Sequence, residues 1–185
     1  MISWPGRKKK QLPQLLRFVP HNILDDCAIC EPFFGTGEFT RALLDTCDRG
    51  CFTTDFRLCL QAMQDACPDN VLVYLDPPYI LETGTYQTDC WGNQELSTLM
   101  DWIQGLETDG HWWMMTDYLA NGDQTHPYAE AIKTHCQVYP LERKHNSRPN
   151  GTSDAKEEVI IVGGSVGEPY PIDSTTNQAA LFQEE

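Results

Sequence analysis

The stretch Val71-Leu72-Val73-Tyr74-Leu75-Asp76-Pro77-Pro78-Tyr79 organises the rest of the sequence. Its first five residues are apolar or favour strands, and they do not alternate with polar residues, so they predict a strand buried on both faces. Neither proline can donate to a sheet ladder, so the strand ends there. Asp76 and Tyr79 are therefore expected at the carboxyl end of a central strand, which is the edge of an open α/β sheet where ligands bind.

A carboxylate, a backbone carbonyl and an aromatic ring would meet at this edge. Pro78 lacks an N–H, so the carbonyl of Pro77 would have no neighbouring amide hydrogen. The Asp76 carboxylate and the Pro77 carbonyl can each accept one hydrogen bond, and the ring of Tyr79 can stack on a flat ligand. The four residues suit an exocyclic amine on a planar ring, and we predict that they form a catalytic site.

The composition is that of a single globular domain. The chain has 185 residues and a formal net charge of −14, and it is long enough to bury a real core. It contains no apolar run near the length of a membrane span. The basic run at residues 7–10 is followed by no apolar stretch, so it does not predict a secretory signal, and we expect a cytoplasmic protein. The acidity favours solubility and is not the electrostatic footprint of a nucleic-acid binder.

Eight cysteines allow two sharper interpretations. Cys27-x2-Cys30 and Cys47-x3-Cys51 have spacings that could frame a zinc site, and a disulfide framework is also conceivable. Cys27 and Cys30 fall within a predicted strand, however, and Cys30 adjoins a motif with another use. We therefore favour small buried residues in a reducing compartment, and we predict no metal.

A strand, a glycine turn and a helix precede the central stretch. Residues 27–31 predict the strand, Pro32-Phe33-Phe34-Gly35-Thr36-Gly37 the turn, and residues 38–44 the helix. This unit brings a backbone close to a nucleotide-like ligand, although G-x-G is an incomplete dinucleotide fingerprint and could simply join two elements. A second strand, residues 51–55, ends at Asp55, which lies 20 residues beyond Gly35. An acid at that separation can hold ribose hydroxyls; the alternative is an exposed acid at a strand end.

The rest of the chain predicts further helices and strands. We expect a first helix that ends near Pro20 and further helices at residues 56–66, 95–106 and 128–135. We expect strands at residues 111–118, 136–145 and 157–162. Trp112 and Trp113 would point to opposite faces of their strand. Residues 80–93 predict a loop that could close over a substrate. The loop between the last two strands carries Lys144 and Arg148, which either meet phosphates and base edges or belong to a solvated hairpin tip.

Together these motifs resemble the Dam-type DNA adenine-N6 methyltransferases. The resemblance rests on Trp4-x-Gly6-x-Lys8, Glu31-Pro32-Phe33-x-Gly35-x-Gly37, Asp55 and Asp76-Pro77-Pro78-Tyr79, in the order of the family. Thr85-Tyr86 and the strand at residues 157–161 also match, so that the resemblance covers roughly residues 2–163. It implies one methyltransferase domain at residues 1–163, after which we expect a flexible tail at residues 164–185.

The resemblance implies a Rossmann-like methyltransferase fold, an α/β doubly wound and mostly parallel sheet with a C-terminal antiparallel hairpin. It implies S-adenosylmethionine as the methyl donor and adenine in DNA as the substrate, in a bacterial or phage-infected cell. Asp76 to Tyr79 would take the adenine. The donor would be bound by Trp4, Lys8, Glu31, Pro32, Phe33, Gly35, Thr36, Gly37, Asp55 and Asp76. The substrate would be contacted by Tyr79, Tyr86, Lys144 and Arg148.

The chain departs from the family between Asp55 and Asp76. Family members place a target-recognition domain of many tens of residues there, whereas here the interval is 20 residues. An edge strand of the sheet is also expected to be missing, which costs little because such a strand has one neighbour. We therefore expect short or degenerate specificity, weak and salt-sensitive DNA binding, or help from a protein partner in target recognition.

Alternatives of two kinds to DNA adenine methylation stay open, another substrate or an inactive protein. The Asp-Pro-Pro-Tyr box also serves the cytosine N4 amine, and the adenine could belong to RNA. The acidity and the missing recognition domain favour instead an inactive subunit that binds the donor and recruits or activates a partner.

Overall fold

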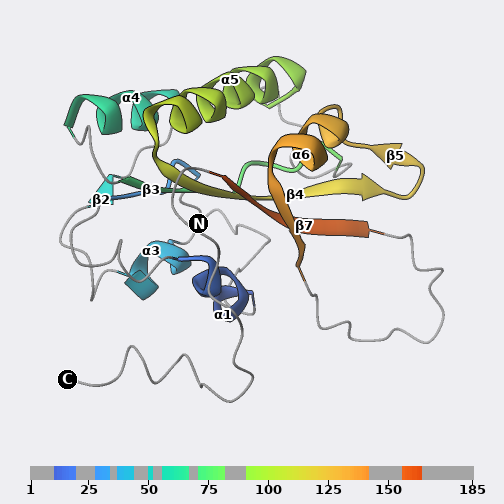
Figure 1. Cartoon of the computed structure of the whole chain (residues 1–185), viewed down its shortest axis with the longest axis horizontal. Helices are drawn as coiled ribbons and strands as arrows, with labels where there is room; N and C mark the ends of the chain where they lie inside the picture. Colours follow the sequence, from blue (N-terminus) through green and yellow to red (C-terminus); the bar gives the residue numbers. More distant parts are fainter. Residues whose placement is uncertain are drawn as a thin grey trace, which may run out of the picture.

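The computed structural model describes residues 11–19, 28–33, 37–43, 50–51, 56–66, 71–81, 91–141 and 156–163. Their strands form one sheet with helices on both faces (Figure 1). α4 (Phe56–Ala66) and α5 (Asn93–Asp109) cover one face, and α1 (Leu12–Leu15) and α3 (Glu38–Leu43) cover the other. The described segments therefore form three layers.

The sheet has a parallel half and an antiparallel half. β2 (Gly50–Cys51), β1 (Ala28–Cys30), β3 (Val71–Leu75) and β4 (Trp112–Asn121) run parallel and lie side by side in that order. β7 (Lys156–Gly163) pairs antiparallel with β4, and β6 (Gln137–Pro140) pairs antiparallel with β7. The short β5 (Gln124–Thr125) pairs with the end of β4. The fold is mixed α/β with a mostly parallel central sheet and some antiparallel strands, which is compatible with a Rossmann-like arrangement.

The order of the strands reverses between β1 and β3. From β1 the sheet continues outward to β2, whereas from β3 it continues to β4 on the other side. Ile29 pairs with Leu72 and Cys30 with Val73, so the residues that follow the two strands lie at the same edge of the sheet. In open α/β sheets this point of reversal is where ligands bind.

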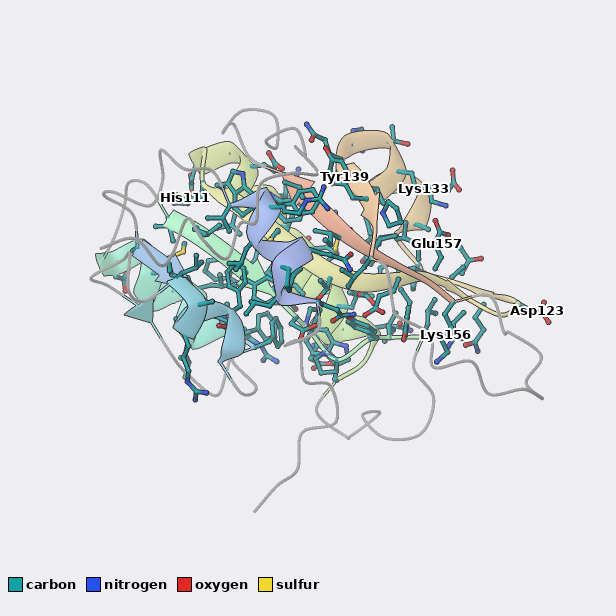
Figure 2. All side chains as sticks on the ribbon, turned by 90° about the horizontal axis from the view of Figure 1, so that it is seen from below. His111, Asp123, Lys133, Tyr139, Lys156 and Glu157 are labelled. Atoms are coloured by element: carbon teal, nitrogen blue, oxygen red, sulfur yellow. The ribbon has the colours of Figure 1, made fainter. Side chains whose placement is uncertain are left out.

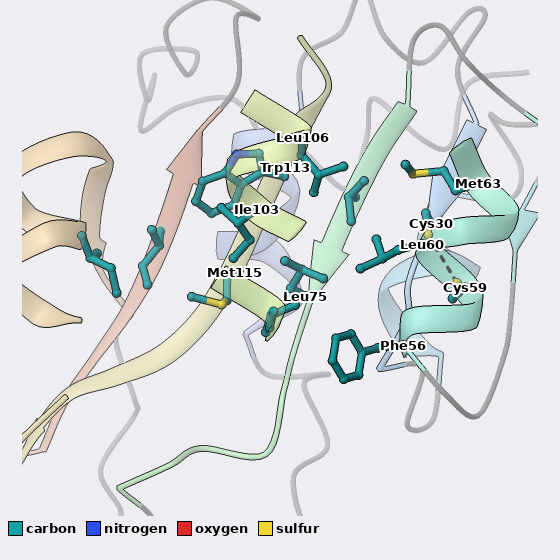
Figure 3. Packing of buried hydrophobic residues seen from close by; sticks show 14 of the residues in the cluster. Cys30, Phe56, Cys59, Leu60, Met63, Leu75, Ile103, Leu106, Trp113 and Met115 are labelled. Carbon is teal, nitrogen blue, oxygen red and sulfur yellow. Dashed lines mark hydrogen bonds between the residues drawn. The ribbon is translucent and has the colours of Figure 1, made fainter. Parts of the chain in front are cut away.

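β3 is buried on both faces, as its apolar run predicts. Each of its five residues is at most 1% exposed. Val71, Val73 and Leu75 pack under α4 and α5, while Leu72 and Tyr74 pack against α1 and α3. Figure 3 shows part of the first cluster, with Leu75 and Trp113 between the sheet and the helices. Trp113 belongs to this cluster and Trp112 to the opposite one, which confirms that the two rings point to opposite faces.

Two elements are longer than the sequence predicts. α5 begins at Asn93, because the Glu95 carboxylate accepts a hydrogen bond from the Gly92 amide over 3.0 Å. It ends at Asp109 and is capped by Gly110, whose φ of 76° favours glycine. β4 continues to Asn121, because its pairing with β7 extends as far as Lys156. The strand crosses much of the molecule, so that His111 and Asp123 lie at opposite sides in Figure 2.

Other elements are shorter than predicted or only partly described. The first helix is α1 followed by a 3-10 turn, η2 (Leu16–Phe18). β6 is assigned as far as Pro140, and the Leu141 amide still donates to the Glu158 carbonyl of β7 over 2.9 Å. Residues 142–145 lie outside the described residues. Of the strand predicted at residues 51–55 only Cys51 is described, as part of β2. The predicted helix at residues 128–135 is α6 (Ala129–His135).

Four other predictions concern undescribed residues or absences. The tail at residues 164–185 and residues 82–90 of the predicted loop lie outside the described residues. β2 is the outermost strand on its side among the described segments, and the loss of an edge strand stays a prediction. Among the helices that the structure describes, none combines the length and the apolar character needed to cross a membrane.

Candidate functional site

Two carboxylates lie where the strand order reverses. Glu31 directly follows β1 and Asp76 directly follows β3, and these neighbouring strands run parallel. The negative charge of Asp76 is one of the factors that raise the pKa of Glu31, so the two side chains interact electrostatically. The structure therefore brings together the acid of the glycine turn and the acid of the central stretch.

Glu31 is buried and bonded to the helix that follows it. Only 3% of the residue is exposed. Its Oε2 accepts a hydrogen bond from the Thr40 amide over 3.1 Å and a second from the Thr40 hydroxyl. Burial raises the pKa of Glu31 from 4.5 to about 7, the bonds from Thr40 oppose this, and Asp76 adds to it. Near neutral pH the side chain can thus be either an acid or a carboxylate, and a nearby cation would favour the carboxylate.

Asp76 is half-buried and held from the neighbouring strand. Its Oδ1 accepts a hydrogen bond from Thr116 Oγ1 over 2.7 Å. Thr116 lies in β4 and is fully buried. Pro77, the next residue, is buried, and Pro78 is half-buried. One carboxylate oxygen is thereby positioned by β4, on a segment whose φ angles the two prolines restrict.

Tyr79 is anchored at both its hydroxyl and its ring. The hydroxyl donates to Glu158 Oε1 over 2.9 Å, and the ring packs edge-to-face on Tyr118 with 4.7 Å between centroids. Only 8% of Tyr79 is exposed. Burial raises its pKa well above the ordinary value, and Asp76 and Glu158 add to this, so the phenol stays protonated and remains a hydrogen-bond donor.

Further polar groups of β3 and β7 lie in the same electrostatic environment. Tyr74 is 1% exposed and Glu158 is 6% exposed. Burial raises the pKa of Tyr74 well above its ordinary value, and Asp76, Glu31 and Glu158 all contribute in the same direction. The edge is therefore strongly acidic, and cationic ligands suit it better than anionic ones.

The described turn residues pack beside Glu31. Pro32 is buried, and Gly37 has a φ of 65°, in the region that favours glycine. The half-buried ring of Phe33 stacks on Phe56 of α4 with 5.3 Å between centroids and meets Trp91 edge-on at 5.4 Å. These contacts fix the entry to the turn against α4.

A further buried acid, Asp117, lies in β4 directly after Thr116. Asp117 and His126 are 1% and 2% exposed, and their Oδ2 and Nε2 atoms are 3.5 Å apart. Asp117 Oδ1 accepts from the Tyr118 amide over 2.7 Å, and His126 Nδ1 accepts from the Tyr128 amide over 3.2 Å. Burial raises the pKa of Asp117, and His126 opposes this effect. The pair joins β4 to the residues that lead into α6.

The structure brings together some of the predicted site residues and leaves others undescribed. Glu31, Asp76 and Tyr79 share one electrostatic cluster, and Pro32, Phe33, Gly37, Pro77 and Pro78 adjoin them in the chain. The predicted residues outside the described segments are Trp4, Lys8, Gly35, Thr36, Asp55, Tyr86, Lys144 and Arg148.

Sequence reasoning missed Thr40, Thr116, the hydrogen bond between Tyr79 and Glu158, and the Asp117–His126 pair. Thr116 and Asp117 are polar residues inside an apolar strand, and that break in the pattern was the available signal. Glu158 was part of a matching motif, but its bond to Tyr79 depends on tertiary structure.

Metal and thiol sites receive no support from the described residues. Within these segments no group of three or more His, Cys, Asp or Glu side chains is arranged to hold a metal ion. Cys30 and Cys59 are buried cysteines that form no disulfide with each other, and their sulfurs lie 3.4 Å apart. Cys27 and Cys47, the other members of the possible zinc frame, lie outside the described residues.

Comparison with models of known protein families and with curated protein sequences finds no match for this chain.

Proposed function

We propose that this chain transfers a methyl group from S-adenosylmethionine to the N6 amine of adenine in DNA, acting in the cytoplasm with a Rossmann-like methyltransferase fold. The observation that carries the proposal is the position of Asp76. It follows the central strand at the point where the strand order reverses, and Thr116 holds one of its oxygens. Glu31 at the end of the adjacent strand supplies a second acid.

The acids of this edge fit the charge of the proposed donor. S-adenosylmethionine carries a sulfonium and an ammonium group, and either would lower the cost of keeping Glu31 and Asp76 charged side by side. Of the described residues, Glu31, Pro32, Phe33, Gly37 and Asp76 would hold it. When bound, the donor would supply an electrophilic methyl group.

The protein would act on the amine by accepting its hydrogens. Adenine N6 is a weak nucleophile, because its lone pair is delocalised into the ring. Hydrogen bonds from the amine to the Asp76 carboxylate and the Pro77 carbonyl would favour a pyramidal nitrogen and direct the lone pair away from the ring. This is electrostatic preorganisation combined with alignment of the reactants. Asp76 would also be within reach to take the proton that the methylated amine must lose.

The target base would have to leave the duplex. A base inside a helix cannot reach a strand end of the sheet, so it would be flipped out and would stack on Tyr79. Tyr86, Lys144 and Arg148 are proposed to contact the nucleic acid. With a net charge of −14, binding should be weak and salt-sensitive, and a protein partner could supply target recognition.

The same negative charge favours a second candidate function, that of a donor-binding subunit that activates or recruits a partner. The test is tritium transfer from labelled S-adenosylmethionine to DNA, to RNA and to protein, followed by nucleoside analysis. Label in N6-methyladenine of DNA supports the proposal. Label in N4-methylcytosine or in RNA would identify cytosine or RNA as the substrate instead. Donor binding without transfer to any acceptor favours the subunit. Absence of donor binding contradicts the whole proposal.

A further inference from the structure

Tyr79 and Glu158 meet across the sheet from segments 79 residues apart in sequence. The Tyr79 hydroxyl donates to Glu158 Oε1 over 2.9 Å, and Gln11 Nε2 approaches the same oxygen at 3.3 Å. Glu158 lies in β7, where it pairs with Tyr118 of β4. The carboxylate is therefore the point at which the central stretch, the C-terminal hairpin and the N-terminal segment converge.

Packing alone does not require this arrangement. A buried carboxylate loses its hydration, and apolar side chains of similar size commonly fill such a place at no loss of stability. A carboxylate bonded to a phenol does something that an apolar pair cannot do, because it fixes the direction in which the phenol points. The bond thus adds directional control to a position where simple burial would have been sufficient.

The ring of Tyr79 is restrained at two ends. Glu158 holds the hydroxyl, and Tyr118 holds the ring edge-to-face at an interplanar angle of 76°. The backbone on its N-terminal side is restricted by Pro77 and Pro78, which connect it to Asp76. The plane of the ring is therefore set relative to the Asp76 carboxylate, which Thr116 holds in turn.

We propose that Glu158 is a positioning residue that fixes the plane of Tyr79, so that a planar base stacked on this ring presents its amine to Asp76. This inference rests on the proposed function for the identity of the base. It assigns no chemical step to Glu158, which would act on the base through Tyr79.

The test combines single and double variants with two measurements. Glu158→Ala, Glu158→Gln, Tyr79→Phe and Glu158→Ala with Tyr79→Phe are compared with the unchanged protein. One measurement is kcat/KM for tritium transfer to duplex DNA. The other is the fluorescence of a duplex with 2-aminopurine at the target position, which reports unstacking and restacking of the base without any methyl transfer.

Glu158→Ala and Tyr79→Phe should each lower kcat/KM about tenfold, as loss of a hydrogen bond to a charged group predicts. The double variant should be no worse than either single variant, since both changes remove the same restraint. Glu158→Gln keeps an acceptor oxygen and should recover activity to within about threefold of the unchanged protein. The 2-aminopurine signal should change in the same order.

The matched control is Glu157→Gln. Glu157 neighbours Glu158 on β7 but is about half exposed, and it faces Lys133 of α6 at 3.7 Å (Figure 2). This change should leave both measurements as they are. Additive losses in the double variant, or an unaltered 2-aminopurine signal in Glu158→Ala, would overturn the inference. Should Glu158→Ala fail to fold, Glu158→Gln and Tyr79→Phe carry the test, and equal losses in these two variants would overturn it.

The two measurements separate this inference from the proposed function. If the unchanged protein transfers no methyl group but its 2-aminopurine signal depends on Tyr79 and Glu158 together, the proposed function fails and the positioning role stands. If methyl transfer proceeds and is insensitive to Glu158, the positioning role fails and the proposed function stands.

Discussion

Thr116 Oγ1 donates a hydrogen bond to Asp76 Oδ1 over 2.7 Å, and so joins the residue that follows β3 to the middle of the neighbouring parallel strand β4. Thr116 is fully buried, whereas Asp76 is half-buried. The bond leaves the carboxylate partly accessible while restricting the directions in which it can point. A side chain that accepts a hydrogen from a substrate amine needs this combination of access and fixed orientation.

Replacing Thr116 with valine should lower kcat for methyl transfer about tenfold, because the carboxylate loses its fixed donor while the shape of the side chain is kept. The measurement is single-turnover tritium transfer at saturating donor. Thr108→Val is the control, since the Thr108 hydroxyl is exposed and donates to the Gln104 carbonyl of its own helix. An unchanged rate in Thr116→Val would show that β4 does not orient Asp76.

Replacing Asp76 with alanine should remove turnover, with a loss of about a thousandfold or more, because one of the two proposed acceptors for the amine is deleted. Donor affinity, measured by calorimetry, should change by less than about tenfold. An Asp76→Ala protein that keeps normal activity would show that this carboxylate has no role in the chemistry.

The central strand could be predicted from sequence because its signal is local. Five consecutive apolar residues followed by Asp76 and two prolines define a buried strand and its end, whatever the strand packs against. The same holds for the position of Glu31 after β1. Local patterns therefore identified the edge of the sheet and Asp76, whereas the site role of Glu31 was predicted from the resemblance.

The partners of these acids could not be predicted in the same way. Thr116 and Asp76 are 40 residues apart in sequence, and Tyr79 and Glu158 are 79 apart. Their contacts depend on strand order and register, which apolar patterns specify only weakly when the strands are buried on both faces. The extent of β4 was underestimated for a related reason, since its last residues are fixed by pairing with β7.

The raised pKa of Glu31 predicts a dependence of stability on pH. In the unfolded chain the carboxyl titrates near 4.5, and in the folded protein near 7. The folded state therefore binds more protons between these values, so the stabilisation is fully present below pH 4.5 and is lost as the pH rises through about 7. The difference between the two pKa values corresponds to ~3 kcal/mol in the free energy of unfolding.

The variant Glu31→Gln removes this dependence. Between pH 5 and pH 8 its free energy of unfolding should fall less than that of the unchanged protein, by up to ~3 kcal/mol, as measured by urea denaturation at several pH values. Glu157→Gln, at an exposed position, is the control and should keep the normal dependence. Parallel curves for the unchanged protein and Glu31→Gln would contradict the raised pKa.

The affinity for the donor should rise with pH, whereas the stability contributed by Glu31 falls with pH. A bound cation favours the ionised form of Glu31, so binding should release a proton near neutral pH, and affinity should increase between pH 6 and pH 8. Calorimetry in two buffers of different ionisation enthalpy measures the released proton directly. Glu31→Gln should bind the donor without that release. A release of equal size in the variant would assign the proton to another group.

The buried Asp117–His126 pair predicts a loss of stability that is separate from the chemistry. His126→Ala would leave Asp117 at 1% exposure without its facing imidazole, and should cost about 2 kcal/mol or more in the free energy of unfolding. His135→Ala, at an exposed position in the last turn of α6, should cost less than about 0.5 kcal/mol. Replacing both Asp117 and His126 with leucine should recover much of the loss, because no unpaired acid then remains in the core. If His126→Ala were as stable as His135→Ala, the pair would contribute nothing to holding α6 against β4, and the turn that follows β5 would have to be fixed by its apolar contacts alone.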